Sequence, residues 1–102
     1  MTRYYLTDYD LLPERTGQVF EVEGEEVALF RLSTGAVAAV ENRSPHPKGG
    51  TLGEGLVSGH YVYCPVYDWK ISLLDGKVQS PDEGQAKIFQ VERDGEQVFI
   101  VK

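Results

Sequence analysis

The stretch of sequence that says most about the fold is residues 41–69, ENRSPHPKGGTLGEGLVSGHYVYCPVYDW. The first part of this stretch, 41–59, contains two prolines and five glycines. Such a density of breakers argues against a helix or a central strand there. A short aromatic strand at 61–64 follows, and 65–67 interrupts it. We expect the two irregular segments to lie near each other at one end of a sheet, which is where a functional site is expected.

The chain on either side of this stretch has strand patterns. Towards the N-terminus, 18–22, 27–32 and 36–40 predict a three-stranded meander, with Gly24 and Gly35 at turns that need a positive φ. Towards the C-terminus, turns at Asp75-Gly76 and Asp94-Gly95 predict two hairpins. The strands expected there are 68–73, 77–79, 86–91 and 97–101. At the start of the chain we expect a strand at 3–6 and a short helical turn within 8–15.

About nine short strands with glycine-bearing turns predict an all-β architecture. The strands are antiparallel in this prediction, and they form a β-sandwich or a small barrel. A length of 102 residues suits one core, so we expect residues 1–102 to form a single domain.

Composition narrows the classes of function. The formal charge is −6 and no lysine–arginine cluster occurs, which argues against nucleic-acid binding. No apolar run of about 18 residues is present, so no membrane span is expected. The first ten residues lack the pattern of a secretory signal, and the single cysteine, Cys64, cannot form an internal disulfide. These observations predict a cytoplasmic protein.

Two short motifs in the irregular segments suggest a metal site. The first is Ser44-Pro45-His46, and the second, Cys64-Pro65-Val66-Tyr67, begins after seventeen intervening residues. This arrangement resembles the Rieske motif, C-x-H followed about 15 to 17 residues later by C-x-x-H. In more detail, the segments 45–50, 68–71 and 77–84 are similar to the small subunit of NAD(P)H-dependent assimilatory nitrite reductase. The resemblance runs from about residue 3 to the end of the chain.

The resemblance implies a Rieske-like fold with an incomplete ligand set. In a Rieske centre two cysteines hold one iron and two histidines hold the other. Carried onto this chain, the cysteine positions are Ser44 and Cys64, and the histidine positions are His46 and Tyr67. A serine hydroxyl has a far higher pKa than a thiol, and the phenol of tyrosine titrates near about 10. We therefore expect no bound cofactor, and a [2Fe–2S] cluster in an atypical site is the alternative.

The resemblance also implies a partner. The large subunit of such enzymes carries the flavin, the sirohaem and an iron–sulfur cluster, and the reduction of nitrite to ammonia in nitrate assimilation takes place there. This chain is then expected to be a non-catalytic subunit that binds the large one. Two alternatives stay open: a Rieske-type electron carrier with an unusual site, and a β-module that binds another oxidoreductase.

Each candidate residue also has a structural interpretation. Cys64 is expected to be a small buried apolar side chain. His46 is expected to brace its loop with a hydrogen bond, and Tyr67 to pack between the two loops. Trp69 is expected in the core. Solvated turn positions are expected for His60, Asp82 and Glu83.

Overall fold

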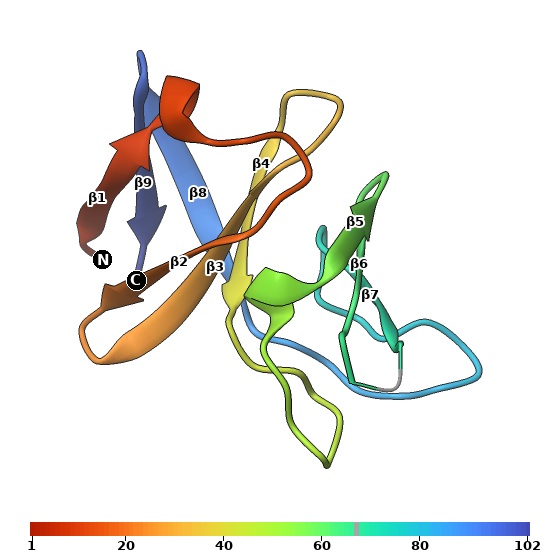
Figure 1. Cartoon of the computed structure of the whole chain (residues 1–102). Coiled ribbons are helices and arrows are strands. Elements are labelled where there is room, and N and C mark those ends of the chain that lie inside the picture. The colour runs from red at the N-terminus through yellow and green to blue at the C-terminus, as the bar shows by residue number, and fades with distance from the viewer. Residues whose placement is uncertain (67) are drawn as a thin grey trace.

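The computed structural model describes residues 1–66 and 68–102, and Figure 1 shows an all-β arrangement. The strands form a six-stranded sheet of order β1-β9-β8-β4-β3-β2 and a three-stranded sheet of order β5-β6-β7, both antiparallel. No helix in the described residues has the length and apolarity to cross a lipid bilayer. The strands are β1 (Arg3–Asp8), β2 (Gln18–Val22), β3 (Glu25–Arg31), β4 (Val37–Glu41), β5 (Leu56–Ser58), β6 (Tyr61–Tyr63), β7 (Lys70–Ser72), β8 (Ile88–Asp94) and β9 (Gln97–Val101).

Strand β3 lies between two apolar clusters. Its four central residues, 27–30, are all buried, because both faces of the strand are covered. Val27 and Leu29 belong to one cluster, while Ala28 and Phe30 belong to the other. Alternate side chains of a strand point to opposite faces, so a continuous apolar run is what such a position requires.

The six-stranded sheet curls around the first of these clusters. All six strands contribute side chains to it, including Tyr4 and Leu6 of β1 and Phe20 of β2. The three-stranded sheet packs against the other side of β3 and β4, with Val62 of β6 and Ile71 of β7 in the second cluster. The prediction of a sandwich or small barrel of short antiparallel strands is confirmed.

The predicted turns are also present. The meander is formed by β2, β3 and β4, with Gly24 at φ +79° and Gly35 at φ +91°. The Asp94-Gly95 turn joins β8 to β9. The single helical turn expected within 8–15 is a 3-10 helix, η1 (Tyr9–Leu11).

Two expectations about strands are wrong. The segment 41–59 is not irregular throughout, because it contains a 3-10 helix, η2 (Leu52–Glu54), and the strand β5. Strand β5 is three residues long, lies at a sheet edge and is flanked by Gly55 and Gly59, so the density of glycine concealed it.

The second error concerns the segments expected to be strands around Trp69 and Val78. Strand β7 begins only at Lys70, because Asp68 has a φ of +53°. Residues 77–79 do not form a continuous strand. They make isolated bridges, Ile71 with Val78 and Lys77 with Gln85.

Candidate functional site

The first loop, 42–51, begins at a buried asparagine. The backbone N–H of Asn42 donates to the carbonyl of Glu26, and its side-chain amide donates to the Glu26 carboxylate at 3.0 Å. Its Oδ1 accepts the N–H of Gly53 at 2.7 Å. Asn42 therefore attaches both ends of the loop region to strand β3.

Ser44 is buried and closes the turn in which it lies. Its N–H donates to the carbonyl of Gly50 at 2.9 Å. Its Oγ accepts the backbone N–H of His46 at 3.1 Å. A serine oxygen that accepts a hydrogen bond from the N–H two residues later forms a common local turn. The hydroxyl of Ser44 therefore stabilises the backbone of its own loop.

His46 braces the tip of the same loop. Its Nδ1 accepts the backbone N–H of Lys48 at 2.9 Å, as the structural interpretation predicts. Its carbonyl accepts the N–H of Gly49. Its ring meets the ring of Trp69 edge to face, with centroids 4.5 Å apart and planes at 66°. Such aromatic pairs stabilise by about 0.5–1.5 kcal/mol beyond the area that they bury.

The second loop, 64–69, is closed at its base. The N–H of Cys64 donates to the carbonyl of Trp69 at 2.9 Å. Cys64 is fully buried in the cluster beneath the three-stranded sheet, and Trp69 packs against that cluster, as expected. Tyr67, the fourth position expected for a ligand, lies outside the described residues.

The two loops meet at Gly50. A Cβ at Gly50 would lie 3.4 Å from Sγ of Cys64 and 3.0 Å from Cγ2 of Val66. Because Ser44 bonds to Gly50 and the ring of His46 contacts the ring of Trp69 edge to face, the three described candidates belong to one contact network. The sequence prediction that the loops lie near each other is confirmed.

A third segment, which ends at Gly84, completes this end of the molecule, although no site role was predicted for it. A Cβ at Gly84 would lie 3.4 Å from Pro45 and 3.5 Å from the ring of Trp69. The role of Asn42 was also missed. Asn42 had no usable signal in the sequence, since it acts through contacts with Glu26 and Gly53, whereas the segment 77–84 carried part of the family resemblance.

The donor set can be tested against a [2Fe–2S] centre, which in Rieske proteins takes two thiolates and two imidazoles. The four positions supply one thiol, one imidazole, one hydroxyl and one phenol. The described residues contain no group of three or more His, Cys, Asp and Glu side chains suited to a metal ion. In addition, Oγ of Ser44 and Nδ1 of His46 both accept hydrogen bonds from the loop backbone. The residues present do not fit an ordinary Rieske centre.

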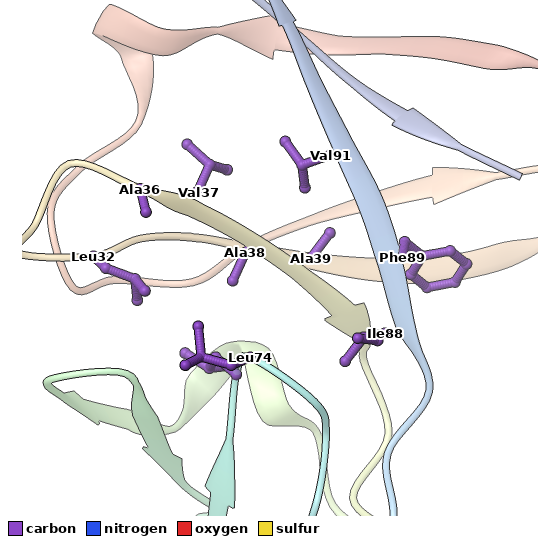
Figure 2. A pocket seen from close by; sticks show the side chains of 10 residues that line it. Leu32, Ala36, Val37, Ala38, Ala39, Leu74, Ile88, Phe89 and Val91 are labelled. Carbon is purple, nitrogen blue, oxygen red and sulfur yellow. The ribbon is translucent and has the colours of Figure 1, made fainter.

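An apolar groove lies away from these loops, between β4, β8 and the turn after β7 (Figure 2). The ladder between β4 and β8 consists of two residue pairs, Ala39 with Phe89 and Val40 with Ile88. Beyond these pairs the strands separate, and the groove of about 220 Å³ opens there. Its lining has no titratable side chain, so it offers apolar contact and no acid–base chemistry. The lining residues are Leu32, Ala36, Val37, Ala38, Ala39, Leu73, Leu74, Ile88, Phe89 and Val91.

Comparison with known families agrees with the motifs and the fold. The model of the Rieske-like [2Fe-2S] domain matches residues 4–101. The chain belongs to this family. The resemblance to the Rieske family found in the sequence is therefore confirmed, and members of the family ordinarily bind a [2Fe–2S] cluster.

Two curated relatives match this Rieske-like chain over part of their length. Cholesterol 7-desaturase nvd of Xenopus laevis is 34% identical over 74 residues, which is 72% of this chain and 16% of the relative. 4beta-Methylsterol monooxygenase of Methylococcus capsulatus is 35% identical over 69 residues, which is 66% of this chain and 18% of the relative. The chain thus spans less than a fifth of either protein.

Solved structures resemble this Rieske-like chain over its whole length. A chain assigned as the small subunit of an NADPH nitrite reductase is 28% identical, with a TM-score of 0.84 and 100% of both chains covered. A chain assigned as the NADH-dependent nitrite reductase small subunit of Mycobacterium tuberculosis has a TM-score of 0.90 at 22% identity, covering 99% of this chain and 95% of that one. The ferredoxin of carbazole 1,9a-dioxygenase from Nocardioides aromaticivorans IC177 has a TM-score of 0.90 at 21% identity, covering 99% and 98%.

Proposed function

We propose that this chain is a cluster-free accessory subunit of an assimilatory NAD(P)H nitrite reductase. The observation that carries the proposal is the full-length similarity to a nitrite reductase small subunit at 28% identity. Similarity to the other small subunit, at lower identity, supports the same fold. The proposal also includes the single domain over residues 1–102 and a location in the cytoplasm.

The chemistry of the four ligand positions supports the absence of a cluster. A thiol titrates at about 8.5 and is readily deprotonated by iron, whereas a serine hydroxyl has no comparable acidity. Ser44 also uses its Oγ within the loop, and His46 uses its Nδ1 there. Hydrogen bonds and the ring contact with Trp69 hold the loops together without an inorganic crosslink.

In this role the chain binds the large subunit, which carries the flavin, the sirohaem and an iron–sulfur cluster. The reduction of nitrite takes place on that subunit. The accessory chain contributes a surface and no reacting group.

The test is purification of the chain without oxygen, followed by an iron assay and a visible absorption spectrum. We expect a colourless protein without stoichiometric iron, because sulfur-to-iron charge transfer would colour a cluster-bearing one. Two irons per chain would overturn the cluster-free assignment. A pull-down with a sirohaem-containing large subunit tests the assignment of the partner, and the absence of binding would contradict it.

A second candidate function is electron transfer through an atypical [2Fe–2S] site. The similarity to the carbazole dioxygenase ferredoxin and the presence of Cys64 and His46 favour it. An electron paramagnetic resonance signal from the reduced parent chain would identify this function. The double change Ser44→Cys and Tyr67→His provides a control, because a coloured double variant beside a colourless parent supports the cluster-free proposal.

A further inference from the structure

The outer face of the three-stranded sheet is exposed at Leu56 and Ser58, half-buried at Tyr61, Tyr63 and Lys70, and covered at Ser72. Val57, Val62 and Ile71 pair across this sheet, and they pack towards β3 and β4. Residues on either side of them along each strand point the other way. Figure 1 shows this sheet on the side of the molecule away from β1, β8 and β9.

The outer face consists of two tyrosines, one leucine, one lysine and two serines. Leu56, Tyr63 and Lys70 form one row across the sheet, and Tyr61 lies in the next row. Leu56 is 79% exposed. Tyrosine is enriched among the contact residues of protein interfaces relative to the rest of the surface.

Tyr61 is held in place by its neighbours. The ring of His60 lies 4.1 Å from the ring of Tyr61, and Nζ of Lys70 lies 4.2 Å from the same ring centroid. Side chains already ordered in the free protein lose less conformational entropy when a partner binds.

The strands of this sheet differ in charge from those of the six-stranded sheet, although Asp75 lies in the turn beside Lys77 and accepts its backbone N–H. The strands of the six-stranded sheet contain seven carboxylates and three arginines, whereas the strands of the three-stranded sheet contain no carboxylate and one lysine. The carboxylates are Asp8, Glu21, Glu25, Glu26, Glu41, Glu92 and Asp94.

A second lysine lies beside this sheet. Val78 bridges Ile71 and is buried in the same cluster, so the neighbouring Lys77 points to the outer face. Among the described residues, neither Lys70 nor Lys77 forms an ion pair. The ion pairs there involve Arg3, Lys87 and Lys102 with Glu92 and Glu25.

We propose that the outer face of β5–β7 docks a carboxylate-bearing surface of a partner protein, with Leu56 entering an apolar recess. The two lysines without carboxylate partners give the charge complementarity, and Tyr61 and Tyr63 give the flat contact area. At physiological ionic strength the Debye length is about 8 Å, so the carboxylates of the six-stranded sheet are largely screened from a partner on the far side. The inference rests on the proposed function in one respect, which is that the partner is the nitrite reductase large subunit.

The test measures the affinity of the large subunit for the full chain by titration calorimetry at about 0.15 M salt. We expect Lys70→Glu with Lys77→Glu to raise Kd at least about tenfold. The neutral pair Lys70→Gln with Lys77→Gln is expected to raise it less. Leu56→Ala is expected to speed dissociation by about tenfold. Circular dichroism and thermal melting verify that each variant is folded.

The matched control is Arg43→Glu with Lys48→Glu, which makes the same change of charge on the exposed first loop. We expect it to leave Kd within about twofold of the parent value. If the control weakens binding and the face variants do not, the inference is wrong and the loops are the docking surface. Equal binding by all variants also overturns the inference while leaving the proposed function intact. If the parent chain does not bind the large subunit, the proposed function fails and the inference fails with it.

Discussion

Asn42 shows how one buried amide can position a loop. Its Oδ1 accepts the N–H of Gly53, and its Nδ2 donates to Glu26, so the loop is attached to β3 on one side and to η2 on the other. A Cβ at Gly53 would lie 2.9 Å from Oδ1 of Asn42 and 2.7 Å from Val19, so this close approach requires glycine. The loop that carries Ser44 and His46 therefore depends on a residue that takes no part in ligand chemistry.

We expect Asn42→Ala to lower the free energy of unfolding by about 1–3 kcal/mol, because it leaves the buried N–H of Gly53 without an acceptor. Urea unfolding measures the loss. The control is Arg43→Ala, an exposed neighbour, which is expected to change stability by less than about 0.5 kcal/mol. An Asn42→Ala variant as stable as the parent would show that water replaces the amide at no cost.

At the scale of elements, the hairpin of β2 and β3 is joined to the far end of the chain by Glu25. Its two carboxylate oxygens each lie 2.8 Å from a lysine, Lys87 before β8 and Lys102 after β9. The hydrogen bond from Lys102, followed by that from Lys87, lowers the pKa of Glu25 below its ordinary value. These contacts connect the ends of three strands.

Glu25→Gln is expected to reduce stability at neutral pH by less than about 1 kcal/mol, because the two ion pairs lie near the surface. A lowered pKa in the folded state stabilises the protein above the ordinary carboxylate pKa, and this contribution is lost as pH falls through the lowered value. The difference between variant and parent should therefore disappear in acid. Urea unfolding over a range of pH tests this, with the exposed turn residue Glu83→Gln as control.

The turn between β8 and β9 is expected to respond to pH in the opposite direction. A side-chain hydrogen bond with Asp10 of η1 raises the pKa of Glu96, and the negative charge of Asp10 acts in the same direction. A raised pKa stabilises the fold below the ordinary value, and the contribution is lost as pH rises through the raised value. Glu96→Gln keeps a donor for Asp10, so it should melt at a higher temperature than the parent at neutral pH. The two should melt alike in acid, and a lower melting temperature at neutral pH would refute this.

At the scale of the whole molecule, local patterns predicted the elements better than their assembly. The meander and the hairpin of β8 and β9 follow from alternation and from glycine turns, both of which are readable over a few residues. The pairing of β1 with β9 and of β4 with β8 joins residues far apart in the chain, so nothing local specifies it. Three-residue β5 lies between glycines, where its pattern is too short to recognise.

The candidate site was predictable to a similar extent. The two irregular segments flank one short strand, which indicated that the loops lie near each other, and the family resemblance assigned Ser44, His46 and Cys64 to one site. The contact of His46 with Trp69 and the third segment at Gly84 arise only when the chain is folded. Tyr67 lies outside the described residues, so its predicted packing stays a prediction.

Strand β3 contributes to both apolar clusters. Val27 and Leu29 face one of them, and Ala28 and Phe30 face the other. Removing either cluster would expose two of these side chains to water while the other two remained covered. A form in which one cluster has melted and the other is intact is therefore high in free energy. We expect the loops and the curled sheet to unfold together.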